Sequence, residues 1–245
     1  MKNHHINKFF NDGVETSFFL SYFCKNTKTY TPMKKLQTIL TLMLVALTAN
    51  AQLCPDNNHP HMIDLGLPSG TKWACCNVDT EHPEKQSPTN YGGYYAWGEL
   101  DGNKDYYYWS TYIHFDNSYN TCHELGSDIA GTEYDVAHVK WGGSWVMPSH
   151  DQIEELLDEC TYKWTTVNGV KGGQFTGPNG KSIFLPAAGY FWYDFLGAGS
   201  VGNYWSSTQD PSYTDNACEL YFSLDYLVWD DRSRYNGFSV RPVSR

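Results

Sequence analysis

Cysteines are the most reactive residues of this chain, and their spacing argues against a catalytic pair. Six of the seven follow residue 51: Cys54, Cys75, Cys76, Cys122, Cys160 and Cys218. No two have the C-x-x-C spacing of zinc or thioredoxin-type sites, and no second thiol stands close in sequence to Cys160 or Cys218. An even number of thiols permits disulfides in an oxidising compartment. Six cysteines allow 15 pairings and the sequence does not choose among them; Cys76 and Cys160 are the best candidates for a bridge.

Histidines and carboxylates also lack a catalytic arrangement. The histidines after residue 51 are scattered: His59, His61, His82, His114, His123, His138 and His150. His59 and His61 flank Pro60, which is typical of a polar terminal segment, with a weak metal site as the alternative. The acids within residues 154–159 share one face of an expected helix, where acids are usually solvated. We therefore predict no enzymatic activity.

The chemistry gathered at the C-terminus is that of recognition. Between Trp205-Ser206-Ser207 and residues 237–243 the chain is dense in Tyr, Asp, Asn and Ser. Tyr and Trp supply large, stiff contact area, while Ser, Asn and Asp supply adaptable hydrogen bonds. We expect this segment to form a binding surface.

Composition restricts the kind of partner. After residue 51 the chain carries 11 basic and 25 acidic side chains, a net charge of −14. Nucleic acids and anionic membranes select for clustered Lys and Arg, so neither is expected as a partner. The same residues include 9 Trp, 17 Tyr and 7 Phe, more than a core of this size needs. Aromatics left on the surface favour contact with carbohydrate or protein.

The N-terminal residues indicate export. Met33-Lys34-Lys35, the apolar residues 36–47 and Ala49-Asn50-Ala51 have the basic, apolar and cleavage regions of a signal peptide. The apolar run is shorter than the roughly 20 residues that span a bilayer, so we predict no membrane span in the mature chain. We assign 1–32 to an over-extended gene start, 33–51 to the signal, 52–61 to a flexible mature N-terminus and 62–245 to one domain. The expected location is the periplasm, the cell surface or the extracellular medium.

Two helices are expected to position these residues. Ser149 and Gln152 form an S-x-x-Q capping box. The apolar residues behind it fall at i, i+3, i+4 and i+7: Ile153, Leu156, Leu157 and Cys160. A shorter helix is predicted over residues 133–140, begun by Thr132 with Asp135 three positions on.

The remaining sequence predicts short strands between turns. The expected strands are residues 71–78, 94–97, 164–167, 173–176, 182–185, 218–224, 227–230 and 238–243. In the strand 218–224, Cys218, Leu220 and Phe222 alternate with polar residues, so it should be half buried, and Asp225-Tyr226 turns it back as a hairpin. The fold class is α+β, with many short antiparallel strands and long loops. The aromatic-rich loop 100–131 should pack or face a ligand.

Several motifs in a fixed order resemble one family. They are IDLGLPSGTKWA (63–74), GYYAWGE (93–99), DVAHVKWGG (135–143), WVMPS (145–149), ELL (155–157), FLPAAG (184–189), YWSS (204–207) and GFSVRPV (237–243). From about Met62 to Val243 the chain resembles the Fibrobacter succinogenes major paralogous domain (FISUMP) family of exported bacterial proteins. The resemblance implies a C-type-lectin-like fold, related to that of formylglycine-generating enzymes, and no established activity.

The C-terminal segment also resembles the variable regions of retroelement-diversified receptor proteins. In those proteins a Trp-Ser-Ser start and a Gly-Phe-Ser-Val-Arg-Pro-Val end hold the fold, while the residues between them contact the ligand. Whether this segment is diversified stays open, because undiversified family members share the ending. With two adjoining aromatics, the implied ligand surface is Trp192, Tyr193, Gln209, Asp210, Tyr213, Asp215, Asn216, Tyr221, Ser223, Asp225, Tyr226, Trp229, Asp231, Arg234 and Tyr235.

Calcium is the one cofactor for which a partial motif exists. Sugar-binding C-type lectins hold Ca²⁺ with carboxylate and amide oxygens, in loops that resemble Gln-Pro-Asp and, later, Trp-Asn-Asp. Here Trp229-Asp230-Asp231 resembles the second loop, while Gln209-Asp210-Pro211 has the first in the wrong order. We predict no cofactor, with calcium at Asp210, Asp230 and Asp231 as the weak alternative.

These observations predict an exported, non-enzymatic module that binds a glycan or a surface protein through its C-terminal face. One alternative is an enzyme on a scaffold like that of formylglycine-generating enzymes, which would lose turnover on mutation of Cys160 or Cys218. The other is a structural subunit of a surface assembly, which would associate in a concentration-dependent way.

Overall fold

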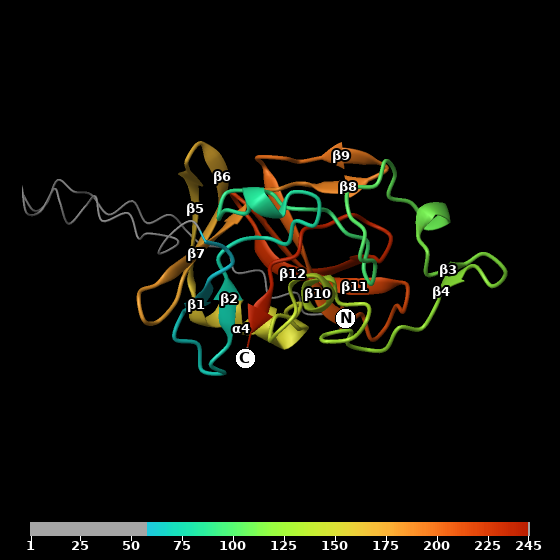
Figure 1. The fold of residues 1–245 in the computed structure, drawn as a ribbon, viewed down its shortest axis with the longest axis horizontal. Coiled ribbons are helices and arrows are strands. Elements are labelled where there is room, and N and C mark those ends of the chain that lie inside the picture. Colours follow the sequence, from blue (N-terminus) through green and yellow to red (C-terminus); the bar gives the residue numbers. More distant parts are fainter. Residues whose placement is uncertain (1–57, 245) are drawn as a thin grey trace, which may run out of the picture. The chain divides into compact units, whose positions relative to one another are not determined.

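The structure is a computed structural model that describes residues 58–244 (Figure 1). The predicted gene start (1–32), the predicted signal peptide (33–51) and Cys54 lie outside the described residues, as does most of the predicted flexible segment 52–61. Within the described part, no helix combines the length and apolar character needed to cross a membrane.

The main helix forms where the capping signals place it. Helix α4 (His150–Glu159) begins after Ser149, whose Oγ accepts a hydrogen bond from the backbone N–H of Gln152, while the Gln152 side chain accepts one from the Ser149 N–H. This reciprocal pair confirms the predicted capping box. The side chains of Ile153 and Leu156 are buried beneath the helix.

The second helix is shorter than predicted and begins later. Helix α3 (Val136–Trp141) is capped by Asp135, which accepts hydrogen bonds from the N–H groups of Ala137 and His138. Asp135 also accepts bonds from Gly131 and Met147, so its buried carboxylate joins two loops to the helix start. Thr132, the predicted first residue, instead forms a turn with Ile129. Two 3-10 turns complete the helices, η1 (Pro83–Lys85) and η2 (Trp109–Thr111).

All strand pairs are antiparallel, in small sheets. One sheet contains β1 (Met62–Asp64), β2 (Lys72–Ala74) and β13 (Val243–Ser244), and another contains β10 (Val201–Gln209), β11 (Asn216–Ser223) and β12 (Leu227–Ser233). A third contains β5 (Thr161–Val167), β6 (Val170–Thr176) and β7 (Ser182–Pro186). Two hairpins form two-stranded sheets, β3 (Phe115–Asp116) with β4 (Thr121–Cys122) and β8 (Tyr190–Trp192) with β9 (Asp194–Leu196). With few helices and many short strands, the domain has the predicted α+β class.

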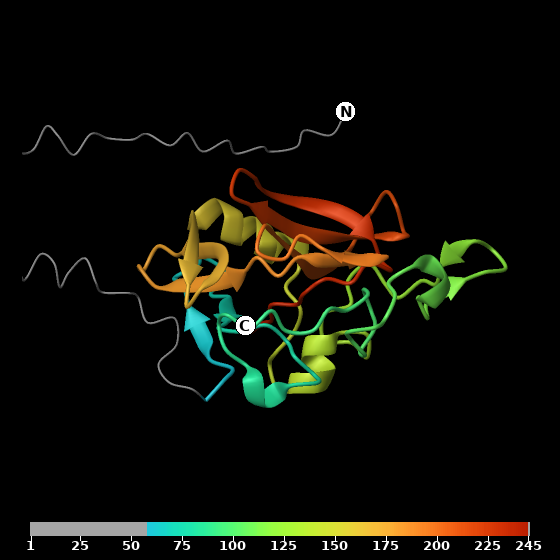
Figure 2. The same cartoon turned by 90° about the horizontal axis from the view of Figure 1, so that it is seen from above.

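The sheet β10–β11–β12 positions the candidate site, and its two faces differ. Cross-strand partners lie on the same face. On one face Leu220 pairs with Trp229 and with Tyr204, and this face packs on α4, beside the sheet in Figure 2. On the other face Tyr221 pairs with Asn203. The hairpin of β11 and β12 confirms the predicted alternation and turn.

The strands predicted over 94–97 and 238–243 form only in part. They meet through the isolated bridge between Tyr95 and Phe238, and of the second segment only Val243 belongs to a strand, β13. Pairing of β13 with β2 brings the last described residues beside the start of the domain. Single backbone hydrogen bonds hold the rest of this segment, from the Val78 N–H to Val240 O and from the Trp205 N–H to Ser239 O. The rings of Trp205 and Phe238 also stack, with centroids 4.2 Å apart.

The predicted disulfide between Cys76 and Cys160 is not formed. No two cysteines of residues 58–244 lie at disulfide distance. Cys160 caps α4 within the cluster that contains Leu156, whereas Cys76 packs in a separate cluster with Ile63 and Trp141. Both thiols are buried in apolar surroundings, which is a common fate of cysteine.

The aromatic loop 100–131 packs in part and projects in part. Tyr107 is buried and donates a hydrogen bond to the carbonyl oxygen of Tyr94. The Tyr108 ring lies 4.6 Å from that of Tyr193, so the loop rests on the β8–β9 hairpin. Beyond it, the β3–β4 hairpin projects from the domain (Figure 1) and carries Tyr119, which is 80% exposed.

Candidate ligand-binding site

A cleft of about 610 Å³ lies on the face of the β10–β11–β12 sheet that is turned away from α4. We call it the aromatic cleft. Its rings come from β8, β11 and the last segment of the chain: Tyr190, Trp192, Tyr221, Tyr235 and Phe238. Its polar side chains are Asn203, Arg232, Ser233 and Asn236, and Gly197 and Val201 complete the wall. Several rings around a few polar groups is the usual make-up of a small-ligand site.

Strand register explains why these side chains converge. Tyr221 and Asn203 are direct partners on neighbouring strands, and Arg232 pairs with Ala217, two positions along β11 from Glu219. Residues i and i+2 of a strand share a face, so the polar groups of three strands meet on one side. Hairpin β8–β9 and the segment after β12 supply the aromatic walls.

A buried carboxylate lies beside the cleft. Glu219 is fully buried, and its Oε2 accepts a 2.7 Å hydrogen bond from the Nδ2 of Asn203. Its Oε1 is 3.6 Å from the Nε of Arg232, which also contacts Asp230 Oδ2 at 2.7 Å. Burial raises the pKa of Glu219 to about 8, although Arg232 and Asn203 favour the charged form. The acid is therefore mostly protonated at neutral pH.

The cleft has hydrogen-bond acceptors that the protein does not satisfy. Among the described residues, Oδ1 of Asn203 and Oδ1 of Asn236 are buried and have no hydrogen-bond partner. Glu219 Oε1 lacks a hydrogen bond too, but it does not line the cleft and is in ion-pair contact with Arg232. Buried polar atoms are nearly always paired, so two unpaired acceptors among the lining residues call for a hydrogen-bond donor. Arg232 in the lining can donate, so the cleft suits a ligand that both donates and accepts hydrogen bonds.

Three of the predicted ligand residues line the aromatic cleft: Trp192, Tyr221 and Tyr235. Tyr193 lies on its outer side, 44% exposed, with its ring against Tyr108. The rings of Tyr213 and Tyr226, about 60% exposed, do not line it, and neither do Ser223 and Asp225 at the β11–β12 turn. The predicted ligand residues are thus divided between the aromatic cleft and surfaces outside it.

Arg234 is not a surface residue, contrary to its predicted place on the ligand face. Its side chain is fully buried and its guanidinium lies 4.6 Å from the centre of the Trp97 ring. It donates hydrogen bonds to the Tyr112 hydroxyl and to the carbonyl oxygens of Thr214 and His123, at 3.0 to 3.1 Å. It therefore joins the long loop to the C-terminal segment.

Trp229 is also placed differently from the prediction. Its pairing with Leu220 puts it on the helix side of the sheet, where its ring meets that of His150 with centroids 4.5 Å apart. It is partly buried against the core and belongs to the packing of α4. The predicted strand over 227–230 forms within β12, but the ring of Trp229 faces α4 and not a ligand.

Two predicted residues border a second, smaller hollow of about 390 Å³. Gln209 and Asp210 are buried there, near Asp151 and Thr208, at the far end of β10. Asp210 Oδ1 accepts from the N–H groups of Ser212 and Tyr213, which shapes the following turn.

The remaining predicted polar residues hold structure together. Asp215 accepts hydrogen bonds from the Cys122 N–H at 2.7 Å and from the Thr121 hydroxyl, which fixes the β3–β4 hairpin. Asn216 donates to Asp231 at 2.8 Å across β11 and β12. Their side chains thus stabilise the frame of the ligand face.

The weak calcium candidates are not gathered into one site. Asp210 binds its own turn, Asp230 contacts Arg232, and Asp231 accepts from Asn216. Within residues 58–244, the groups of three potential metal ligands involve other residues. The only support for calcium at these aspartates is therefore the partial motif in the sequence.

Sequence reasoning missed the polar half of the aromatic cleft: Asn203, Glu219, Arg232, Ser233 and Asn236. The alternation in residues 218–224 placed Glu219 and Tyr221 on one face, and this signal could have found them. The prediction assigned Tyr221 and Ser223 of that face to the ligand surface and left out Glu219, which is fully buried. Asn203 lies in β10, a strand that no periodic pattern in the sequence predicted.

Comparisons of the chain with protein-family models, with curated proteins and with solved structures find no match. The function therefore has to be argued from the cleft.

Proposed function

We propose that this protein is a non-enzymatic binding module that holds a carbohydrate in the aromatic cleft. The observation that supports it most is the pair of unpaired acceptors, Oδ1 of Asn203 and Oδ1 of Asn236, beside a wall of aromatic rings. A sugar supplies both complements, since its hydroxyl groups donate hydrogen bonds and its C–H faces pack on rings.

The aromatic residues are suited to stacking. Trp192 is 50% exposed at the mouth of the cleft, and its ring meets that of Tyr193 at a centroid distance of 5.6 Å. Rings held in place by neighbours lose little conformational entropy when a ligand arrives. A flat sugar face would cover Trp192, while the hydroxyls reach Asn203 and Asn236.

The charge of the site bears on the ligand class. Arg232 is the charged residue in the lining, and it is already paired with Asp230 at 2.7 Å and lies 3.6 Å from Glu219. An anionic ligand would have to compete with these carboxyl groups for the guanidinium, whereas a neutral or amino sugar would not. The proposed ligand class is therefore a neutral or amino sugar.

The wider setting is part of the same proposal. The sequence resemblance to the FISUMP family supports a C-type-lectin-like fold, and the small antiparallel sheets with one main helix are consistent with it. The signal-peptide pattern supports export to the periplasm, the surface or the medium. The C-type-lectin-like fold and the export remain proposals, and sugar binding in the aromatic cleft does not depend on either.

The experiment is a glycan-array screen of the full chain, followed by titration of the best sugar with matched variants. Trp192→Ala removes an exposed ring at the cleft and should weaken binding at least about tenfold, the order reported for loss of base–ring stacking. Tyr226→Ala is the control, because its ring is equally exposed but lies outside the cleft. Adding a calcium chelator should leave binding unchanged.

Two results would contradict the site. If Tyr226→Ala lost binding while Trp192→Ala bound normally, the ligand would bind at the outer face predicted from the sequence and not in the aromatic cleft. Association with proteins and with no sugar on the array would exclude the carbohydrate.

A further inference from the structure

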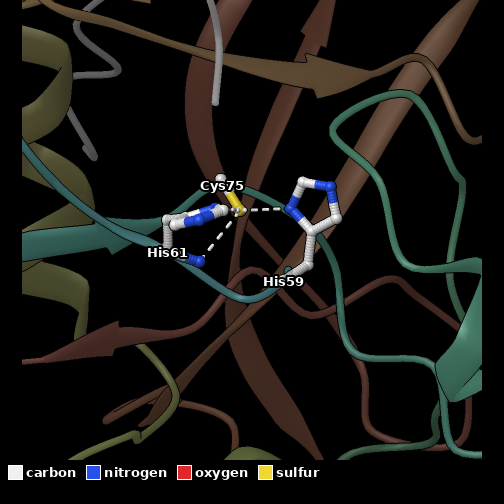
Figure 3. Close-up of side chains that lie close together, drawn as sticks. All are labelled: His59, His61 and Cys75. Carbon is white, nitrogen blue, oxygen red and sulfur yellow. Dashed lines mark hydrogen bonds between the residues drawn. The ribbon is translucent and has the colours of Figure 1, made fainter. Parts of the chain in front are cut away.

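Three potential metal ligands meet where the described chain begins (Figure 3). The Nδ1 of His59 lies 3.2 Å from the Sγ of Cys75, and the Nδ1 of His61 lies 3.7 Å from the same sulfur. One donor atom from each of the three residues lies within 4.8 Å of the other two. Both imidazoles therefore point at one thiol.

The β1–β2 hairpin creates this arrangement. Its antiparallel pairing continues beyond the strand ends, because the backbone N–H of Cys75 donates to the carbonyl oxygen of His61 at 3.0 Å. Cys75 is thus held beside His61. His59 stands two residues before His61, and its ring meets the second imidazole edge-on, with centroids 5.2 Å apart.

The spacing fits a zinc-type ion. With bonds of about 2.1 Å to nitrogen and about 2.3 Å to sulfur, two donors bound tetrahedrally to one zinc ion are about 3.5 Å apart. The two measured nitrogen–sulfur distances, 3.2 and 3.7 Å, lie on either side of this value. Small rotations of the half-exposed imidazoles would complete the geometry without movement of the backbone.

The sulfur has a backbone donor in addition to the imidazoles. The backbone N–H of His61 donates to Sγ at 3.1 Å, an interaction that stabilises a thiolate. Metal binding replaces the thiol proton, which leaves to solvent, and the imidazoles bind as neutral ligands. Cys75 is 1% exposed while the histidines are half-buried, so the ion would be reached from the imidazole side.

We propose that His59, His61 and Cys75 form a site for a divalent zinc-type cation, with a fourth position left for water or an outside ligand. The site would tie residues 59–61 to the end of β2 and so fasten the start of the domain. A thiolate with two imidazoles suits zinc better than calcium or magnesium, which prefer oxygen ligands.

A second group of potential ligands in the described chain is weaker. His150, Asp151 and Glu154 lie at the exposed start of α4, and the His150 ring packs on Trp229. Exposed acids near a helix start need no metal to explain them. No metal site is proposed at this group.

The test uses the full chain with its thiols kept reduced by a phosphine. Zinc ion should raise the melting temperature by about 5 °C or more, because it binds the folded state. His59→Gln and His61→Gln should each weaken zinc binding at least about tenfold and remove most of this rise. His82→Gln is the control, since this histidine is exposed, lies 3.7 Å from Glu84 and does not belong to the group of potential ligands.

Cobalt ion gives a second readout that reports on sulfur. Bound Co²⁺ should show a thiolate charge-transfer band and tetrahedral d–d bands, and Cys75→Ser should remove the former. Because Cys75 is buried, the two histidine variants carry the test if the serine variant fails to fold. The proposal is overturned if zinc stabilises His59→Gln and the wild type equally, or if the cobalt complex lacks the thiolate band.

Discussion

Asn203 donates its side-chain N–H to the buried carboxylate of Glu219 at 2.7 Å and leaves its own Oδ1 without a partner in the described structure. The two residues lie on neighbouring strands, and both face the side of the sheet that holds the aromatic cleft. The bond fixes the orientation of the Asn203 amide, because its N–H must point at the acid. Its oxygen is thereby presented to whatever enters the cleft.

Replacing Glu219 with Gln should change how stability depends on pH. The folded pKa of about 8 lies above the ordinary value of 4.5, so folding favours the protonated acid. Its contribution to the free energy of unfolding is complete below about pH 4.5 and is lost as the pH rises through 8. Each pKa unit corresponds to about 1.4 kcal/mol. Urea unfolding between pH 5 and 9 should therefore show a smaller decline for Glu219→Gln than for the wild type.

The exposed acid Glu154 supplies the control for this measurement. Glu154→Gln is the same chemical change at an exposed position and leaves Glu219 in place, so it should keep the wild-type decline. Parallel curves for the wild type and Glu219→Gln would show that the buried acid ionises at its ordinary pKa, contrary to the prediction.

Arg234→Met should destabilise the domain by about 3 kcal/mol or more. The change leaves the carbonyl oxygens of Thr214 and His123 without their buried donor and removes the cation above the Trp97 ring. Arg234→Lys keeps the charge but not the three diverging donors, so it should be intermediate. Chemical denaturation measures both. Normal stability with lost ligand binding would instead support the ligand-contact role expected from the sequence.

Ser149→Ala should cost about 1 kcal/mol by removing the cap of α4. The helix packs on all three strands of the central sheet, so its loosening should lower the melting temperature of the whole domain by roughly 2–4 °C. Circular dichroism melting measures the change. Asp151→Ala is a suitable comparison, because this exposed first-turn residue has no capping bond among the described contacts.

Local signals in the sequence predicted the elements that are determined locally. The capping box fixed α4 to within a residue of its observed start, and the alternation of Leu220 and Phe222 predicted β11 with its turn. The strands predicted over 173–176 and 182–185 form within β6 and β7. In each case neighbouring residues alone decide the conformation.

Features that depend on distant contacts could not be read from the sequence. Arg234 and Trp229 have the residue types of a binding surface, but the long loop covers the first and α4 covers the second. Similarly, His59 and His61 gained a metal-like geometry only because the β1–β2 hairpin brings Cys75 beside them. The spacing of residues along the chain does not show which distant residues come into contact in the fold.

Asn236→Leu should separate binding from stability in the aromatic cleft. The Oδ1 of Asn236 is buried without a partner, and replacing an unsatisfied polar group with an apolar one of similar size removes a desolvation cost. The free energy of unfolding should therefore stay constant or rise, while sugar affinity falls about three- to tenfold through loss of one hydrogen bond. Asn117→Leu, on the exposed turn between β3 and β4, should change neither quantity. A variant of Asn236 that binds the sugar normally would mean that the unpaired acceptors do not hold the ligand, and the proposed function would lose its main support.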